Sequence, residues 1–440
     1  TYTFKLRNNS HWAMFSGHKA VLGENYEDTF DITVKAEDFK FGIERTLSEQ
    51  TGSADAPLFS AVKSISTPDD FTIVFNLSYA DDNFLYALTN PGAMPCDEEF
   101  FNLTNGKYGL DAKYLLCNGP FHVSKWTEKT SVKLAKNNEY NGESSVSPSS
   151  VTFYINNDDS EVADKMNSVT YDVAFLSSSQ FSSIENKKDL NSVAVQNVTY
   201  SFIFNQNDNN YRNKNMRLAF CRSCDTSSLF DSQSDISKAD GIVPPSCKIG
   251  GEDYRNGNAA ELLSYDETLA KKNFNDALLD LGSSSVETTI LCTEQYEPFV
   301  KQMVQKLQKT LGVKLVSTVK VVSESDLEAA VNDGNYSVAF YPFKAKSSFA
   351  GEIIEGFDQN NIFGYESDVL SQKIRNIKNN SGSLEGERSA VADAENYLVS
   401  EAVIMPVFYE NSYFVTSKKT SGIYFYSSAD NVCFINAKKS

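Results

Sequence analysis

The most regular pattern of hydrophobic and polar positions covers residues 286–343. Residues 286–292 are a short apolar run rich in β-branched side chains, which is typical of a buried strand. Apolar side chains then recur at the spacing of one helix face, at Phe299, Val300, Met303, Val304, Leu307 and Leu311. Gly312 follows, where the end of a helix often needs a positive φ. We therefore expect a strand and then a helix before residue 313.

The same alternation continues to residue 343. Residues 313–322 predict a second strand, and Ser323 predicts the N-cap of a helix that extends through Val331. Residues 336–343 predict a third strand. Alternating strands and helices predict a parallel sheet, and ligands bind such sheets beyond the carboxyl ends of the strands. The third strand should therefore bring four residues to the edge of a binding site: Tyr341, Phe343, Lys344 and Lys346.

The rest of the chain predicts an α/β protein with two lobes and mixed sheets. The predicted segments are 1–114 (a small antiparallel sheet with helices, part of lobe one), 115–205 (the core of lobe one), 206–403 (lobe two) and 404–440 (the return to lobe one). Two extended stretches, 198–206 and 403–410, lie at the borders of lobe two. Two extended crossings between lobes are the geometry of a hinge.

The N-terminal region predicts a small sheet. Residues 1–7 and 72–77 both alternate as strands do, and we expect them to pair in antiparallel fashion. Within residues 32–47, the apolar spacing predicts a helix that opens at residues 35–38 and is acidic at its start. Because the chain begins inside the first of these strands, we expect a processed or truncated product whose true start lies upstream.

Composition and charge exclude several classes of protein. The chain has 440 residues, of which 41% are hydrophobic and 12% aromatic, so it is long enough for two or three folded cores. Its net charge is −18, and nucleic acids and anionic membranes attract the opposite charge. No apolar run reaches the roughly 20 residues that a membrane span requires.

Seven cysteines are few for a chain of this length, so disulfides cannot be its main support. Cys96 and Cys117 flank a loop-rich segment, and we expect them to form one disulfide that contributes roughly 3 kcal/mol. Cys221 and Cys224 form a CxxC motif, which occurs in redox and zinc sites. That motif lies in an apolar helical pattern without a second ligand pair, so we expect buried structural cysteines.

Candidate catalytic and metal-binding residues are sparse. His11 and His18 lie near Asp28 and Asp31 along the chain, but their spacing matches no metal-binding motif, and we expect a solvated loop. His122 alternates within a predicted strand and is interpreted as structural. Nucleophile-elbow, phosphate-loop and dinucleotide-binding motifs are absent from the sequence. We expect no cofactor, no metal and no enzymatic activity.

Six segments occur in an order typical of one family. They are YTFKLR (2–7), VKAEDFKFGIERTL (34–47), TPDDFTIVFNLSYADDNFLYAL (67–88), GPFHVSKW (119–126), YSFIFNQ and NKNMRLAF (within 200–220) and AENYLVSEAVIMPVFYENSYFVTSK (394–418). The chain resembles the extracellular solute-binding proteins of the oligopeptide- and dipeptide-binding type, the receptors of peptide ABC importers. The resemblance covers essentially all of the chain.

This resemblance implies a periplasmic-binding-protein fold of type II, in which two lobes close on a ligand by a hinge motion. It implies two partners, a peptide or other small solute and the membrane permease that receives it, for a receptor that is a monomer and binds no nucleic acid. It also implies either a lipid anchor on the outer face of a Gram-positive membrane or a periplasmic location. The signal and the first strand of lobe one would precede this chain.

The chain departs from the family at the expected amine-binding position. In peptide-binding members, a carboxylate just after the strand that matches residues 336–343 binds the α-ammonium of the ligand. The alignment places Lys346 at that position, with Lys344 two residues earlier. An ammonium group would repel the ligand's ammonium and would attract a carboxylate. Two interpretations stay open: a changed ligand, or an alignment shifted by one or two residues with both lysines in solvent.

These observations lead to a set of candidate ligand contacts and to four functional hypotheses. The candidates are Tyr341, Phe343, Lys344 and Lys346 in lobe two, Asn90, Asn118 and Phe121 in lobe one, and Asn205 near the first crossing. The main hypothesis is a peptide receptor, and the first alternative is a receptor for a modified peptide or an anionic small molecule. An extracellular hydrolase and a surface signalling or adhesion module are the remaining hypotheses.

Overall fold

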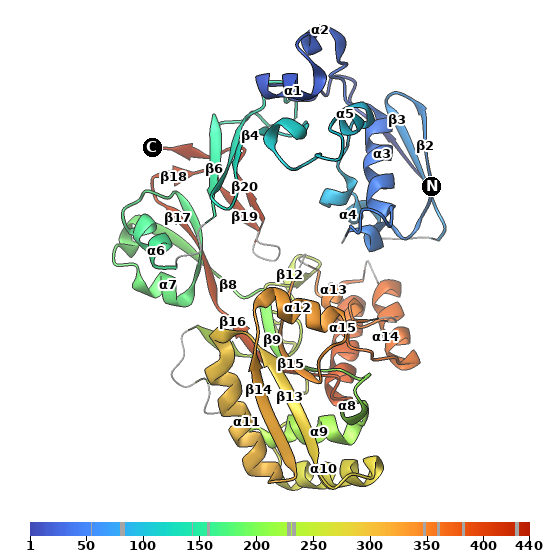
Figure 1. The fold of residues 1–440 in the computed structure, drawn as a ribbon, viewed down its shortest axis with the longest axis vertical. Coiled ribbons are helices and arrows are strands. Elements are labelled where there is room, and N and C mark those ends of the chain that lie inside the picture. The colour runs from blue at the N-terminus through green and yellow to red at the C-terminus, as the bar shows by residue number, and fades with distance from the viewer. Residues whose placement is uncertain are drawn as a thin grey trace. The chain divides into compact units, whose positions relative to one another are not determined.

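The computed structural model describes residues 1–53, 55–79, 84–142, 144–155, 159–226, 230, 235–345, 349–358, 361–380, 383–426 and 431–440 (Figure 1). The chain divides into two compact units. Unit 1 contains residues 1–161, 418–424 and 432–440, and unit 2 contains residues 162–417 and 425–431. Both units contain sheets and helices, which confirms the α/β class. The division into four segments stays a prediction.

Unit 1 is built around two three-stranded sheets. One sheet has the order β1-β3-β2, with β1 at Tyr2–Lys5, β2 at Val62–Asp69 and β3 at Thr72–Leu77. The predicted antiparallel pairing of β1 with β3 is confirmed, with Phe4 opposite Ile73. Helix α3 (Ala36–Leu47) packs on this sheet and buries Ile43 against it, which confirms the predicted helix.

The second sheet of unit 1 contains β4 (Phe121–Thr127), β5 (Ser131–Lys136) and β6 (Ser150–Tyr154) in that order. The short helices of this unit are α1 (Lys19–Leu22), α2 (Tyr26–Thr29), α4 (Phe84–Ala87) and α5 (Glu98–Leu103). Strand β18 (Thr420–Ser421) pairs with β21 (Lys438–Lys439) near the C-terminus.

Unit 2 contains a six-stranded sheet of order β10-β16-β9-β15-β13-β14. Its strands are β9 (Val198–Phe204), β10 (Ile236–Lys238), β13 (Val286–Cys292), β14 (Leu315–Val321), β15 (Val338–Lys344) and β16 (Ile404–Glu410). Strand β13 runs parallel to β14 and β15, and α11 (Glu297–Leu311) and α12 (Glu324–Asn332) connect these strands. The alternation predicted for residues 286–343 is confirmed.

The two predicted crossings are extended, and both pair inside this sheet. Strand β9 is antiparallel to β15 on one side and to β16 on the other. Strand β16 therefore runs in the same direction as β13, β14 and β15. The residues of β9 from Ser201 to Phe204 are fully buried, because helices cover both faces of the sheet.

Helices cover the sheet in two groups. Helices α9 (Lys214–Ser223), α10 (Glu267–Leu281) and α11 share one core with the face that carries Phe202 and Phe340. Helices α12, α13 (Gly351–Glu355), α14 (Asp368–Asn379) and α15 (Leu384–Ser400) share the other core with Ile203 and Ala339. Because successive side chains of a strand point to opposite faces, each strand supplies both cores.

The remaining elements are short. Unit 2 has a second sheet of order β7-β17-β8, with β7 at Val173–Ser177, β8 at Leu190–Val195 and β17 at Ser412–Ser417. The other elements are α6 (Asp159–Asn167), α7 (Ser178–Ser183), α8 (Asn209–Arg212), β11 (Lys248–Ile249), β12 (Glu252–Asp253), β19 (Tyr424–Tyr426) and β20 (Asn431–Cys433). Among the described residues, no helix has the length and apolar character needed to span a membrane.

The structure corrects the prediction of a disulfide between Cys96 and Cys117. The thiols of all seven cysteines are free. The Cys96 thiol lies 3.7 Å from Nη1 of Arg45 and 4.0 Å from the carbonyl oxygen of Asp97, so other groups occupy its surroundings. The expectation for the CxxC motif is confirmed, because Cys221 and Cys224 are both buried and burial raises the pKa of each thiol to about 12.

The expectation of a solvated histidine loop is wrong for His18. This side chain is fully buried between Phe15 and Phe100, and its Nε2 lies 3.2 Å from the carbonyl oxygen of Leu115. Burial lowers the pKa of His18 to about 4. In the described part of the chain, no group of three or more His, Cys, Asp or Glu side chains could hold a metal ion.

Candidate functional site

The candidate site is the carboxyl edge of the six-stranded sheet, where β13, β14, β15 and β16 end. Lys344 is the last residue of β15, and Glu410 is the last residue of β16. Strand β9 lies between them and begins at this edge with Val198, which pairs with Lys344. Four strands that end together leave their following loops and helix starts at one edge, which is where such sheets bind ligands.

Three of the predicted contacts lie on β15, and they divide between its two faces. Tyr341 and Phe343 are half-buried on the face that packs against α12–α15. Phe343 stacks on Phe357 with ring centroids 5.7 Å apart, and Tyr341 meets Phe343 edge-on at the same separation. Lys344 is exposed and lies on the opposite face. The fourth candidate, Lys346, lies outside the described residues.

Glu410 is a charged residue of this edge that the sequence pattern did not single out. Its Oε1 accepts a hydrogen bond of 2.6 Å from the hydroxyl of Tyr296, which directly precedes α11. Burial raises the pKa of Glu410, and the negative charge of Glu324 adds to the rise, while the Tyr296 hydrogen bond and the positive charge of Lys344 oppose it. The sequence signal that could have identified Glu410 is its position as a carboxylate at the end of a strand that runs parallel to β15.

A cluster of aromatic rings lies next to this carboxylate through the Tyr296 hydroxyl. The rings of Tyr200 and Tyr296 lie 4.4 Å apart, and both rings pack against Phe408, two residues before Glu410. Burial raises the pKa of both tyrosines, so both hydroxyls stay neutral at physiological pH. The edge therefore combines a half-buried carboxylate with electron-rich rings.

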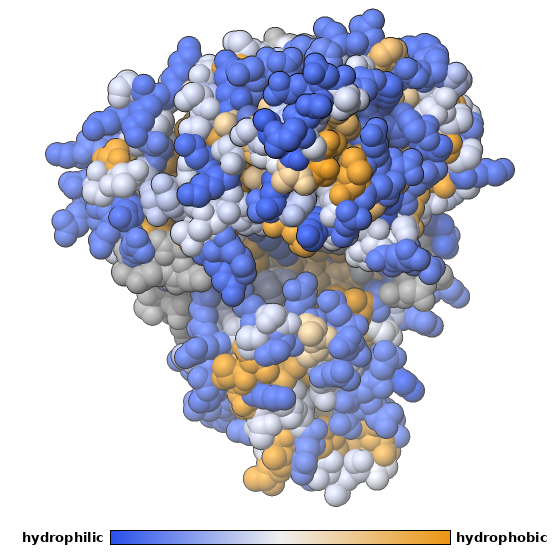
Figure 2. Space-filling view, turned by 45° about the horizontal axis from the view of Figure 1, so that its top comes forward, coloured by the Kyte–Doolittle hydropathy of each residue, from blue (hydrophilic) through white to orange (hydrophobic). Residues whose placement is uncertain are grey.

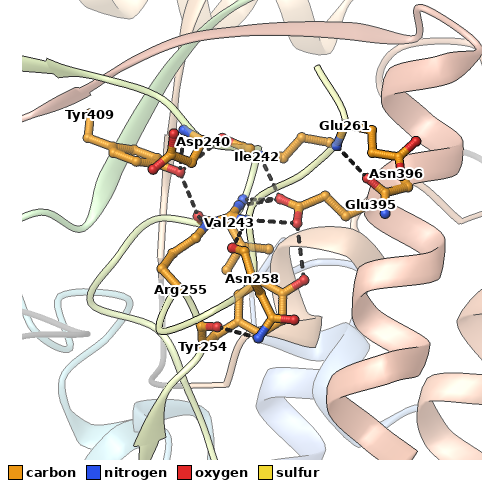
Figure 3. A network of polar contacts seen from close by, with 11 residues as sticks. Asp240, Ile242, Val243, Tyr254, Arg255, Asn258, Glu261, Glu395, Asn396 and Tyr409 are labelled. Atoms are coloured by element: carbon orange, nitrogen blue, oxygen red, sulfur yellow. Dashed lines mark hydrogen bonds and ion pairs between the residues drawn. The ribbon is translucent and has the colours of Figure 1, made fainter. Parts of the chain in front are cut away.

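A buried polar network holds the end of β16 in place (Figure 3). The hydroxyl of Tyr409 accepts a 3.0 Å hydrogen bond from the backbone N–H of Asp240, next to the loop that contains Ile242 and Val243. The backbone N–H groups of Ile242 and Val243 donate to Oε1 of Glu395 on α15, at 2.7 and 2.9 Å. Because Tyr409 directly precedes Glu410, this network restrains the strand end that carries the candidate site.

Asn205 is the predicted candidate from the first crossing, and its side chain forms hydrogen bonds with the protein backbone. The side-chain amide of Asn205 donates to the carbonyl oxygens of Gly334 and Tyr336, at 2.8 and 2.7 Å, and its Oδ1 accepts from the backbone N–H of Asn207 at 2.9 Å. These bonds tie the end of β9 to the turn before β15. A role of Asn205 in ligand binding stays a prediction.

The remaining predicted candidates belong to unit 1. Asn90 is the N-cap residue of a short 3-10 helix, and its side-chain amide donates to the carbonyl oxygen of Ala87 at 3.3 Å. Asn118 is half-buried in a loop, and Phe121 is the half-buried first residue of β4. Their contacts with a ligand stay a prediction.

A cavity of about 200 Å³ lies at the opposite end of β16. It is lined by Cys221, Cys224, Leu263 and the first residues of the strand, from Ile404 to Val407. The carboxyl edge and this cavity are therefore different places in unit 2. The surface in Figure 2 is mostly hydrophilic with separate hydrophobic patches, in keeping with the net charge of −18.

Comparisons with known proteins identify the family to which the chain belongs. Residues 1–363 match the model of the family described as "Bacterial extracellular solute-binding proteins, family 5 Middle". The dipeptide-binding protein DppE of Bacillus subtilis is 23% identical over 446 residues, which cover 96% of this chain and 78% of that protein. The chain belongs to the family 5 extracellular solute-binding proteins. It is a binding protein and not an enzyme.

Solved structures confirm the two-lobed fold. The substrate-binding domain of an oligopeptide ABC transporter from Bacillus anthracis has a TM-score of 0.78 and 18% sequence identity, and the match covers all of this chain and 87% of the other. OppA of Listeria monocytogenes, solved with a bound peptide, has a TM-score of 0.77 and 21% identity with the same coverage of 100% and 87%.

Proposed function

We propose that the protein is the peptide receptor of an ABC importer. Membership in the family carries the proposal, and relatives named dipeptide- or oligopeptide-binding proteins support a peptide as the ligand. The receptor binds the peptide outside the cytoplasm, its two lobes close on it, and the closed form delivers it to the membrane permease. Ligand binding shifts the protein to the closed form only by the difference in affinity between the two forms.

The proposed contacts combine sequence and structure. In unit 2 the ligand meets the carboxyl edge of the six-stranded sheet, where Tyr341, Phe343 and Lys344 end β15 and Lys346 follows. Asn90, Asn118 and Phe121 contribute from the other lobe, and Asn205 from the end of β9. Hydrogen bonds to the peptide main chain tolerate many sequences, and pockets accept the side chains. We also propose that the receptor is a monomer that is either attached by a lipid to the outer face of the membrane or periplasmic.

An anionic ligand is the alternative that Lys344 and Lys346 raised. The half-buried carboxylate of Glu410 beside Lys344 disfavours it, because a second negative charge at the same edge would be repelled. A change of Lys346 to Asp should shift ligand preference toward amines. Unchanged affinities across a peptide library would remove Lys346 from the site.

Isothermal titration calorimetry tests the proposal. The purified protein is first unfolded, freed of retained ligand and refolded, and then titrated with alanine peptides of two to six residues and with succinate as a small dianion. We expect saturable heat with at least one peptide and none with succinate. Binding of succinate without binding of any peptide would overturn the peptide assignment.

A further inference from the structure

Glu410 and Lys344 lie on the same face and at the same edge of the sheet. Glu410 directly follows Tyr409, which pairs with Thr199, and Lys344 pairs with Val198, so the two residues flank the first residue of β9. Neighbouring strands are about 4.8 Å apart, which places the two backbones roughly 10 Å from each other. Both side chains extend toward the face that carries Tyr200, and the two charges interact.

The Glu410 carboxylate keeps capacity for a further donor. Among the described residues, it accepts one hydrogen bond, from the hydroxyl of Tyr296 to Oε1. An ionised carboxylate accepts about four hydrogen bonds through its two oxygens. A neutral phenol does not neutralise the charge, and a half-buried charge without full compensation lowers stability unless a cation approaches it.

The charges and rings of the edge favour a cationic group. Among the described residues, the charges that act on Glu410 are one carboxylate, that of Glu324, and one ammonium group, that of Lys344. The rings of Tyr200 and Tyr296 lie close by, and aromatic faces attract ammonium groups. A carboxylate, a phenol and aromatic faces together form the chemistry that recognises a primary ammonium.

We infer that Glu410 is the residue that determines specificity at this edge and that it receives a primary ammonium group of the ligand, the α-amino group of a peptide. This inference rests on the proposed function. The proposed ammonium site is on β16, whereas Lys346 follows β15 in the sequence. Tight binding then requires a peptide with a free N-terminus, although the residue after β15 at the expected amine-binding position is a lysine.

The test compares free and N-acetylated alanine peptides of two to six residues by calorimetry. The wild-type protein should bind the free peptides about 10- to 100-fold more tightly, because hydrogen bonds between charged groups have this strength. Glu410→Gln keeps the acceptor for Tyr296 and removes the charge, so it should reduce the difference to within about threefold. Glu324→Gln, a nearby carboxylate at the start of α12, is the matched control and should retain most of the preference.

Each outcome decides the inference. If Glu410→Gln retains the wild-type preference for free peptides, or if the wild type binds both series equally, Glu410 is not the ammonium site. The proposal of a peptide receptor is unaffected by either result. If the wild type binds neither series, the proposed function fails and the inference fails with it. If Glu410→Gln does not fold, the wild type titrated at pH 7 and at pH 4 replaces it, and equal losses of affinity in both series would overturn the inference.

Discussion

Glu395 accepts hydrogen bonds from the guanidinium of Arg255 through both of its oxygens, and the two side chains are only 1% and 8% exposed. Both residues also bind the same loop, because Arg255 donates to the carbonyl oxygen of Val243 at 2.7 Å and Glu395 accepts from the backbone N–H of Val243. The hydroxyl of Tyr254 donates to Oε2 of Glu395 at 3.1 Å. This pair joins α15 to the loop that supports the end of β16.

Glu395→Gln should destabilise the protein by about 3–5 kcal/mol, because it leaves the Arg255 charge buried without its partner. Chemical denaturation monitored by circular dichroism measures this change. Asp393→Asn on the same helix is the matched control, since the ion pair of Asp393 with Lys373 has a carboxylate that is 59% exposed and should contribute less than about 1 kcal/mol. Equal effects of the two variants would show that the buried pair has no special role.

His18 should make the protein less stable in mild acid. Its pKa is lowered to about 4 by burial, while an unfolded histidine has a pKa near 6.5. Between these two values the unfolded state binds more protons, so stability falls as the pH falls from about 6.5 to about 4, by at most about 3 kcal/mol. The fully buried ring therefore favours the neutral form.

The measurement compares His18→Phe with the wild type by denaturant unfolding at pH 7, 5.5 and 4.5. The variant should lose stability at pH 7, and the gap to the wild type should narrow as the pH falls. Asp38, whose pKa burial raises to about 6, has the opposite dependence, but it is present in both proteins and cancels. His11→Gln serves as the control. A constant gap between His18→Phe and the wild type would contradict the account.

Free thiols provide a third prediction. Because the cysteines form no disulfide, the intact mass should correspond to seven reduced thiols, and a reducing agent should leave the melting temperature unchanged. Mass spectrometry after alkylation in denaturant should find all seven cysteines modified. A mass two daltons lower, with Cys96 and Cys117 protected from alkylation, would show that the disulfide predicted from the sequence is present.

Peptide binding should weaken as Glu410 takes up a proton. Its pKa is raised by burial, so the loss begins at a pH above the ordinary glutamate value of about 4.3. The groups that face Glu410 are Tyr296 before α11, Glu324 on α12, Tyr200 on β9 and Lys344 on β15. Calorimetry from pH 7 to pH 4 should show falling affinity for free peptides and constant affinity for acetylated ones, and a parallel fall in both series would contradict this role.

Local patterns predicted much of the fold of unit 2. The strands and helices of residues 286–343 could be predicted because a buried strand and a one-sided helix each leave a periodic apolar pattern. The antiparallel partner of β15 could not be found this way. Residues 198–206 predict an extended segment, but no local pattern shows that β9 inserts between β15 and β16.

The strand end that carries three of the candidate contacts could be predicted, and their role in ligand binding stays a prediction. Lys344, Tyr341 and Phe343 were expected at the end of β15 because a parallel sheet places ligands there, and the structure puts that strand end beside Glu410. Glu410 itself depends on the direction of β16, which pairing over long sequence distances determines. The role of Glu395 could not be predicted from the sequence either, because it is one of several acidic residues on α15 and its partner Arg255 lies 140 positions earlier.

The most direct test of the central claim is native mass spectrometry of the protein purified from an extracytoplasmic compartment. Receptors that close on a ligand often retain it through purification. We expect adducts that fragment into series of amino-acid residue masses, and exchange of these adducts for an added alanine peptide with a free N-terminus. Adducts of a small molecule without amino-acid residues, together with failure of every added peptide to bind the emptied protein, would contradict it.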